Sequence, residues 1–244
     1  MSDGRYIALF SGGKDSYLAL EMAQENGYTI DRLVTVEADQ GSYLYHTPTT
    51  QLTTDIAASL SLPLERIEVS TQSDQSAGSE GAADREIEPL VNWLDDTLES
   101  EARPPAGLIS GVVESQYQYD RLSDVCTARD LELVTPLWQL DGHAVLDAVL
   151  DRQLEVDIVA VAADGLDRSW LGRRLDREAI AALKELAEEY GIHPAGEGGE
   201  FETLVVDAPA FDFPIRYDAE VVWEGNRGHL VLTDSTDSRA QSVQ

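Results

Sequence analysis

The residues best suited to chemistry stand together near the start of the chain, in the run Ser11-Gly12-Gly13-Lys14-Asp15-Ser16. A glycine pair between a strand and a helix lets backbone N–H groups turn toward an anion at the positive end of the helix. Lys14 adds a point charge, and Ser11 and Ser16 add hydroxyl donors. We interpret the run as a phosphate cradle on an exposed loop. Its spacing matches neither the Walker loop nor the dinucleotide-binding glycine motif.

Alternating apolar runs and helical patterns must position this loop. In the first half of the chain, strands are predicted at 6–10, 32–37, 67–70, 107–113 and 131–135, and helices at 14–26, 51–60, 85–101 and 119–129. Such alternation is typical of a parallel sheet whose ligands bind outside the carboxyl ends of the strands. The polar, small residues 71–84 are expected to form a mobile surface loop.

The last third of the chain changes character. Helices are predicted at 143–154 and 177–190, and strands at 156–162, 203–206 and 220–223, with a hairpin signal at 225–228. The expected fold class is therefore α/β, a parallel sheet with helices on both faces plus a smaller C-terminal α+β part. We divide the chain into an N-terminal nucleotide-binding domain (1–135), a smaller C-terminal domain (136–234) and a flexible tail (235–244).

The charge balance is extreme, since 46 Asp+Glu against 17 Lys+Arg give a formal net charge of -29. The acid is spread along the whole chain, and Lys14 and Lys184 are the only lysines. We infer adaptation of the surface to concentrated salt, where screening over about 3 Å at 1 M mutes self-repulsion. The expected source is an extreme halophile. The sequence contains no basic run, which disfavours direct nucleic-acid binding, although this argument is weaker in a halophile.

Several classes of protein are disfavoured by composition. With 43% apolar residues the chain is expected to fold. It contains no apolar stretch of about 18 residues and no basic-then-apolar start, so we expect a cytoplasmic protein without membrane contact. Cys126 is the only cysteine, which excludes an internal disulfide, and its spacing from Leu122 and Val125 predicts packing on a helix face.

The loop resembles the PP-loop of the N-type ATP pyrophosphatases, which have a HUP-like nucleotide-binding fold. The resemblance implies that ATP is cleaved between its α and β phosphates, with Lys14 acting in catalysis. It also implies Mg²⁺, for which Asp15 is a candidate ligand. The residues implied in binding pyrophosphate are Ser11, Gly12, Gly13, Lys14, Asp15 and Ser16.

Further strings narrow the resemblance to the diphthine–ammonia ligase family, over nearly the whole chain to about Glu224. The most specific string, which resembles the family's archaeal members, is Gly196-Glu197-Gly198-Gly199-Glu200-Phe201-Glu202-Thr203. Ser123 departs from the pattern, because relatives tend to have a glutamate there. The other strings, in order, are Ser42 to Pro48, Tyr117-Gln118 with Arg121-Leu122 and Val125-Cys126, Pro136-Leu137-Trp138, and Gly165-Leu166-Asp167 with Leu171-Gly172-Arg173.

The resemblance implies a ligase that forms a C–N bond. ATP would activate the carboxylate of diphthine, a modified histidine on translation elongation factor 2, and ammonia would convert it to the amide, with release of AMP and pyrophosphate. The partners implied are this protein substrate and ammonium, and a homodimer is left open. Glu200 and Glu202 are the candidates for binding ammonium and accepting its proton, with Glu197 beside them. The alternative is that these three are surface acid in an acidic protein.

Diphthine also carries a trimethylammonium group, which aromatic faces favour. The candidates for such a cage in the matched strings are Tyr43, Tyr45, Tyr117, Trp138 and Trp170, with His46 and Gln118 as polar contacts. Taken singly, each aromatic is better explained as an ordinary packing residue, because large aromatic side chains dominate packing. Arg173 and Arg174 could bind phosphate or pair with neighbouring carboxylates. His143, His193 and His229 have no metal-ligand spacing and are expected to be structural or exposed.

Two alternatives to this function stay open at the level of sequence. Another PP-loop ligase would modify tRNA or amidate a small molecule. A nucleotide-sensing module would bind ATP or AMP without catalysis, although it would have no need of the acid-glycine cluster.

Overall fold

The computed structural model describes residues 4–38, 52–69 and 79–233. Five parallel strands form its first sheet, in the order β3-β2-β1-β4-β5. Because the chain builds outward from β1 through β2 to β3 and then returns to place β4 on the other side, the strand order reverses at β1. Open α/β sheets bind ligands at this point. The strands are β1 (Arg5–Leu9), β2 (Thr29–Ala38), β3 (Leu64–Val69), β4 (Gly107–Ile109) and β5 (Glu132–Val134).

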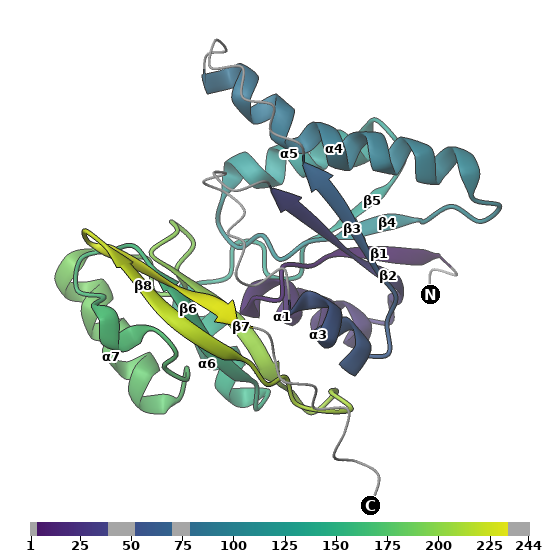
Figure 1. The fold of residues 1–244 in the computed structure, drawn as a ribbon. Helices are drawn as coiled ribbons and strands as arrows, with labels where there is room; N and C mark the ends of the chain where they lie inside the picture. Colours follow the sequence, from purple (N-terminus) through teal and green to yellow (C-terminus); the bar gives the residue numbers. More distant parts are fainter. Residues whose placement is uncertain (1–3, 39–51, 70–78, 234–244) are drawn as a thin grey trace, which may run out of the picture.

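Helices cover both faces of this sheet, as predicted (Figure 1). Helices α1 (Lys14–Glu25) and α3 (Thr53–Ser59) lie on one face, and α4 (Ser79–Ser100) and α5 (Gln116–Thr127) on the other. The α5 face buries Cys126 in an apolar cluster with Leu122 and Val125, which confirms its packing role. Burial raises the pKa of the Cys126 thiol to about 11.

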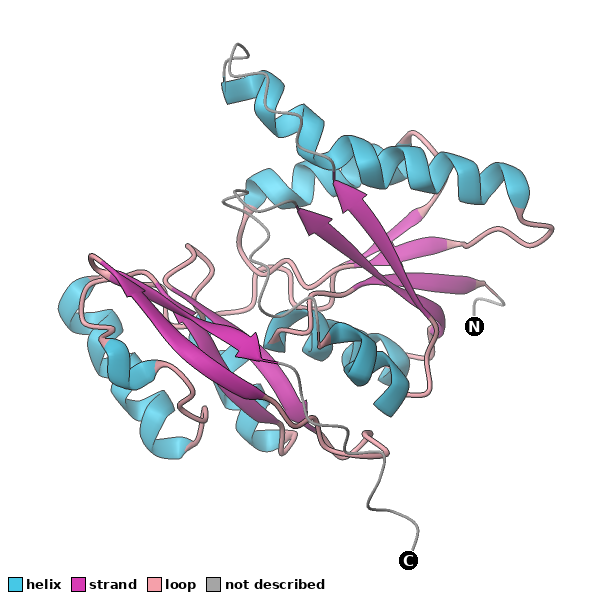
Figure 2. Ribbon diagram, viewed as in Figure 1, coloured by secondary structure: helices cyan, strands magenta, loops and turns pink. Residues whose placement is uncertain are grey.

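The second sheet is antiparallel, in the order β7-β6-β9-β8 (Figure 2). Its strands are β6 (Glu155–Val161), β7 (Phe201–Asp207), β8 (Asp218–Glu224) and β9 (Arg227–Thr233), accompanied by α6 (Gly142–Asp151), the short 3₁₀ helix η1 (Arg168–Trp170) and α7 (Arg177–Tyr190). The predicted hairpin is confirmed, because Glu224 of β8 pairs with Arg227 of β9 across a two-residue turn. Helix α7 has the predicted bounds.

Helix α1 lies between the two sheets and contacts strands of both (Figure 1). One apolar core runs from Ala8 of β1 through Leu18 of α1 to Val145 of α6 and Leu204 of β7. The amino end of α1, where the glycine loop is attached, is therefore held from two directions.

Two predicted boundaries differ most from the structure. Residues 79–84, expected in a loop, begin helix α4, because Ala82 and Ala83 are strong helix formers that a reading of the segment as polar and small overlooked. Strand β4 ends at Ile109 instead of continuing to Val113. After Ser110, whose N–H still donates to the Val134 carbonyl at 2.9 Å, the chain turns toward α1 and then into α5.

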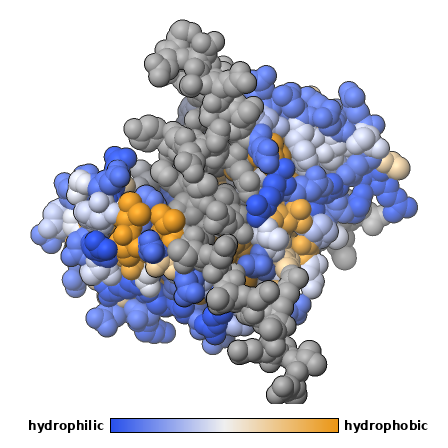
Figure 3. Space-filling model, viewed as in Figure 1, coloured by the Kyte–Doolittle hydropathy of each residue, from blue (hydrophilic) through white to orange (hydrophobic). Residues whose placement is uncertain are grey.

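The face of the molecule seen in Figure 3 is largely hydrophilic, with small separate apolar patches. Within residues 4–38, 52–69 and 79–233, no helix combines the length and the apolar character that crossing a bilayer requires.

Candidate functional site

The glycine loop follows β1 and leads into α1, at the point where the strand order reverses. Gly12 has φ +81°, a backbone conformation that other residues rarely adopt, and it approaches Thr53 and Ile56 of α3 closely. Gly13 caps the helix without a side-chain hydrogen bond, so no side chain of the N-cap residue occupies the positive end of α1. This geometry is that of an anion cradle.

The two serines of the loop hold its shape. Ser16 Oγ donates to the Gly13 carbonyl at 3.0 Å and accepts from the Ser11 N–H at 3.3 Å. Ser11 Oγ accepts from the Gly13 N–H at 3.3 Å and lies 3.2 Å from Ser16 Oγ. Both hydroxyls therefore stabilise the shape of the loop. A bound phosphate would have to share them with these internal hydrogen bonds.

Strand β7 of the second sheet pairs with this loop along its outer edge. The Val205 N–H donates to the Gly12 carbonyl at 2.9 Å, and the Lys14 N–H donates to Thr203 Oγ1 at 3.1 Å. An unpaired sheet edge exposes backbone donors and acceptors, and here the glycine loop satisfies part of that edge. The specific Gly196–Thr203 string and the glycine loop, 180 residues apart in sequence, thus form one site.

Lys14 corrects our expectation of an exposed phosphate contact. Its side chain is buried, with only 2% of the residue exposed. The ammonium donates to the Ala195 carbonyl at 2.5 Å and to Asp15 Oδ2 at 2.9 Å, and lies 5.3 Å from the centre of the Phe201 ring. The cause is tertiary: the segment before β7 covers the loop. Lys14 therefore links the glycine loop to the segment before β7, and its contacts contribute to the stability of the fold.

Two carboxylate oxygens in this region are buried without a hydrogen-bond partner among the described residues. They are Oδ1 of Asp15 and Oε2 of Glu200. A buried unpaired carboxylate oxygen is costly, and such an atom in a native structure points to a missing cation or donor. Each carboxylate has its other oxygen satisfied, by Lys14 and by the His193 N–H respectively.

The three predicted glutamates have different surroundings. Glu197 Oε1 accepts from the backbone N–H groups of residues 113–115, at 3.4, 3.1 and 3.0 Å, just before α5. Glu200 Oε1 accepts from the His193 N–H at 2.8 Å. Alternation along β7 places Glu202 on the opposite face of the strand from Phe201 and Thr203. The structure thus brings Glu197 and Glu200 to the loop that carries Ala195, and Glu202 to the far face.

The candidates for an aromatic cage are not gathered in one place. Tyr43, Tyr45 and His46 lie outside the described residues. Tyr117 of α5 is half exposed, with the Arg121 guanidinium 4.6 Å from its ring centre, and Gln118 beside it is exposed. Trp138 stacks on Tyr119 at 4.2 Å.

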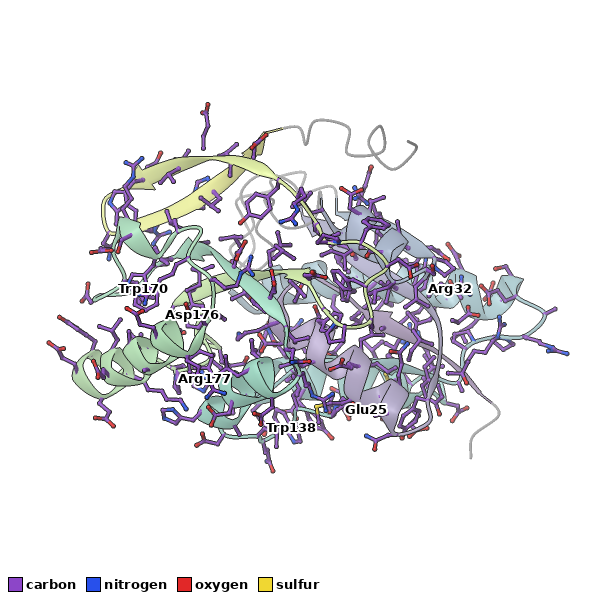
Figure 4. The ribbon with its side chains drawn as sticks, turned by 90° about the horizontal axis from the view of Figure 1, so that it is seen from below. Glu25, Arg32, Trp138, Trp170, Asp176 and Arg177 are labelled. Atoms are coloured by element: carbon purple, nitrogen blue, oxygen red, sulfur yellow. The ribbon has the colours of Figure 1, made fainter. Side chains whose placement is uncertain are left out.

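Trp170 is buried and lies far from Trp138, on the side of the second sheet (Figure 4). Its ring face is covered by Arg173 at 4.4 Å, so it cannot share a cage with Trp138. Arg174 pairs with Glu155 and with the buried Asp157, which answers the question left open for that residue in favour of carboxylate pairing.

Sequence reasoning missed two residues at the site. His193, expected to be structural or exposed, hydrogen-bonds through its ring and backbone to residues of the Gly196–Thr203 string. Gly111 lies against the first turn of α1, where a Cβ atom would fall 2.6 Å from the Asp15 carbonyl carbon. Only the position of Gly111 directly after an apolar run could have hinted at so close an approach.

A parallel sheet with a glycine loop at its switch point defines an α/β protein of the PP-loop fold class. The sequence model of the diphthamide synthase N-terminal domain matches residues 4–133, and that of the diphthamide synthase C-terminal domain matches residues 141–237. The chain therefore belongs to the diphthamide synthase family.

Similar full-length proteins are named diphthine–ammonia ligase. The one from Danio rerio is 34% identical over 229 residues, covering 88% of this chain and 87% of the relative. Those from Bos taurus and Homo sapiens are each 32% identical over 228 residues, covering 89% of this chain and 84% of the relative.

Proposed function

We propose that this chain is a diphthine–ammonia ligase, an enzyme that forms a C–N bond by converting the carboxylate of diphthine on translation elongation factor 2 into an amide. ATP and ammonium are its other substrates, and AMP and pyrophosphate are released. Membership of the family and likeness to relatives of that name along most of the chain support this activity. The observation that links this activity to the site is the pair of buried carboxylate oxygens on Asp15 and Glu200 that have no hydrogen-bond partner among the described residues.

The first half of the reaction belongs to the glycine loop. A carboxylate becomes a good electrophile only when one of its oxygens can leave with AMP, and donors that stabilise the departing pyrophosphate promote that activation. The positive amino end of α1, which the glycine loop precedes, would supply this stabilisation. Lys14 adds positive charge from below the loop, where the Ala195 carbonyl and Asp15 hold it.

Asp15 fits a magnesium ion, because its free Oδ1 is the kind of hard oxygen that Mg²⁺ prefers. The described residues contain no group of three His, Cys, Asp or Glu that could hold a metal. We therefore expect phosphate oxygens and water to supply ligands beside Asp15. When bound, the ion would neutralise charge on the triphosphate.

The second half of the reaction belongs to Glu200. Its free Oε2 is placed to accept a hydrogen bond from ammonium, whose proton must leave before the neutral amine can attack the adenylate. The His193 N–H, bound to Oε1, holds the carboxylate in place. Glu202, on the other face of β7, is a weaker candidate for this proton transfer.

The direct test is reconstitution. The full chain is incubated with Mg-ATP, ammonium chloride and elongation factor 2 carrying diphthine, and the mass of the factor is measured together with AMP and pyrophosphate. We expect an acid-to-amide mass shift that requires all three additions. ATP cleavage with an unchanged factor would overturn the proposal.

Glu200→Gln separates the two half-reactions. Gln keeps an oxygen that can accept from the His193 N–H, but replaces Oε2 with an uncharged donor that cannot bind ammonium. We expect amide formation to fall about 100-fold while ATP–pyrophosphate exchange changes by less than about threefold. Glu188→Gln, on the exposed side of α7, is the matched control. Equal loss of both half-reactions would instead assign Glu200 to ATP.

We also propose that the chain comes from an extreme halophile, as its charge of -29 and its two lysines suggest. Circular dichroism and thermal melts across a KCl series test this. Stability should rise with salt as self-repulsion is screened. An unchanged melting temperature from dilute buffer to concentrated KCl would contradict it.

A further inference from the structure

His193 makes five hydrogen bonds within the site, through both of its ring nitrogens, its N–H and its carbonyl, which accepts from the Gly196 N–H at 2.9 Å. Its Nδ1 lies 3.2 Å from the Ala195 nitrogen and 3.3 Å from the Glu197 nitrogen. Its Nε2 lies 3.1 Å from Glu114 Oε2, and its own N–H donates to Glu200 Oε1 at 2.8 Å. The segment 193–200 is thus folded around one imidazole.

These contacts fix the tautomer of the ring. Backbone N–H groups can only donate, so Nδ1 must present its lone pair to Ala195 and Glu197. The hydrogen of the neutral ring is then on Nε2, where it donates to the Glu114 carboxylate, in the loop that leads into α5.

The residues that His193 orients include the one that holds Lys14 and the one with the unpartnered carboxylate oxygen. Ala195 presents its carbonyl to the Lys14 ammonium, and Glu200 carries the free oxygen assigned to ammonium. Glu197 accepts hydrogen bonds from the N–H groups of residues 113–115. Both Glu197 and the His193 ring therefore bond to the same loop, the one that carries Glu114. The ring itself is confined by α6, because a Cβ at Gly142 would lie 2.7 Å from His193 Cε1.

We propose that His193, in the Nε2–H tautomer, is a positioning residue that holds the Ala195 carbonyl and Glu200 in the geometry needed for the two half-reactions. The catalytic part of this proposal rests on the proposed function, whereas the tautomer of His193 and its role in holding the loop do not. It touches no reacting atom; it acts through Ala195, Glu197 and Glu200.

Two amide substitutions divide its roles. In His193→Asn, Oδ1 stands where Nδ1 stood, so the Ala195 and Glu197 N–H groups keep an acceptor while the bond to Glu114 is lost. In His193→Gln, the amide nitrogen can reach Glu114, but the two loop N–H groups lose their acceptor. Because buried donors left unpaired cost more than a lost exposed bond, the rate of amide formation should fall at least about tenfold further in His193→Gln than in His193→Asn. The KM for ATP should change by less than about threefold in either variant.

Nitrogen NMR of the full chain, labelled at histidine, reads the tautomer directly and needs no activity. The His193 signal, assigned by its loss in His193→Asn, should show an unprotonated Nδ1 and a protonated Nε2 at neutral pH. His229→Asn, at an exposed position of β9, is the matched control for the substitutions.

A protonated Nδ1, or a His193→Gln variant as active as His193→Asn, would overturn the proposal. If the unsubstituted chain forms no amide, the proposed function fails, whereas the NMR result and the relative melting temperatures of the two variants still decide the role of His193 in the loop. In that case a higher melting temperature for His193→Asn than for His193→Gln supports that role, and the reverse order refutes it.

Discussion

Helix α1 meets the C-terminal part of the chain at both of its ends, and the two contacts are built differently. At its amino end the contact is buried: Lys14 donates from its backbone to Thr203 and from its ammonium to the Ala195 carbonyl. Near its carboxyl end the contact is closer to the surface: the partly buried Arg152 pairs with the partly buried Glu21 at 2.8 Å and with the exposed Glu25 at 2.7 Å. Figure 4 shows Glu25 on the outside of the helix.

The two contacts have different roles. The buried contact maintains the shape of the glycine loop, whereas the ion pairs at the other end only help to fix the orientation of α1. Hydrogen bonding to Glu25 and Glu21 raises the pKa of Arg152 above its ordinary value and lowers that of the Glu25 carboxyl, so the pair stays charged over the whole working range of pH. Exposed pairs of this kind contribute little and are screened by salt. The Lys14 contact is buried, so solvent does not readily replace a lost partner there, and it should tolerate much less change.

The largest effect is expected for Lys14→Met, which keeps the apolar stem of the side chain and removes the charge. The Ala195 carbonyl and Asp15 lose their donor in a buried place, which should lower the free energy of unfolding by about 3 kcal/mol. ATP–pyrophosphate exchange should fall more than about 100-fold. Thermal melts and exchange assays with labelled pyrophosphate measure the two effects.

Lys184→Met is the matched control, since Lys184 is the only other lysine and forms a surface pair with Asp147. It should leave both stability and exchange nearly unchanged. A Lys14→Met protein as stable as the control would show that the buried contact matters no more than a surface pair, which removes the contrast between the two ends of α1.

A smaller effect is expected for Thr203→Val, which preserves shape but removes the acceptor for the Lys14 N–H. One unpaired buried donor should lower the free energy of unfolding by about 1–2 kcal/mol. Because the loop is less firmly held, kcat/KM for ATP should fall about tenfold. Thr97→Val in α4, equally buried but remote from the loop, serves for comparison. Similar losses in both variants would mean that the hydroxyl is not specific to the site.

The smallest effect is expected for Arg152→Met. It breaks the surface contact, and the melting temperature should fall by about 1–2 °C in dilute buffer and less in concentrated salt. Activity should not change, because no atom of the loop is involved. If the fall in melting temperature grows with salt, the pair is not stabilised by charge attraction, and our account of this end of α1 is wrong.

Local pattern was enough to predict the amino end of α1. The run from Ser11 to Ser16 after an apolar strand specifies a strand, a tight turn and a helix start, and the parallel sheet follows from the alternation of elements. The bounds of α7 were also predictable, because Asp176 caps its first turn and Gly191 ends it.

The burial of Lys14 could not be predicted in this way. Nothing near position 14 indicates that residues 195 to 205 will lie over it, since that placement depends on how the second sheet packs against α1. The tautomer of His193 is likewise set by two backbone N–H groups whose direction is decided by the fold of its own loop. Motif resemblance selected Glu200, but only the packed structure shows that one of its oxygens has no partner.

The bond between Lys14 and Thr203 joins residues 189 positions apart, which matters for the order in which the protein is made. During synthesis the amino-terminal half leaves the ribosome first and can begin to fold. The glycine loop then exists long before the strand that pairs with it. We expect the nascent chain, and any fragment left by interrupted translation, to carry this loop without the contacts that hold its lysine. Under the proposed function, we therefore expect ATP to be consumed only when the chain is nearly finished.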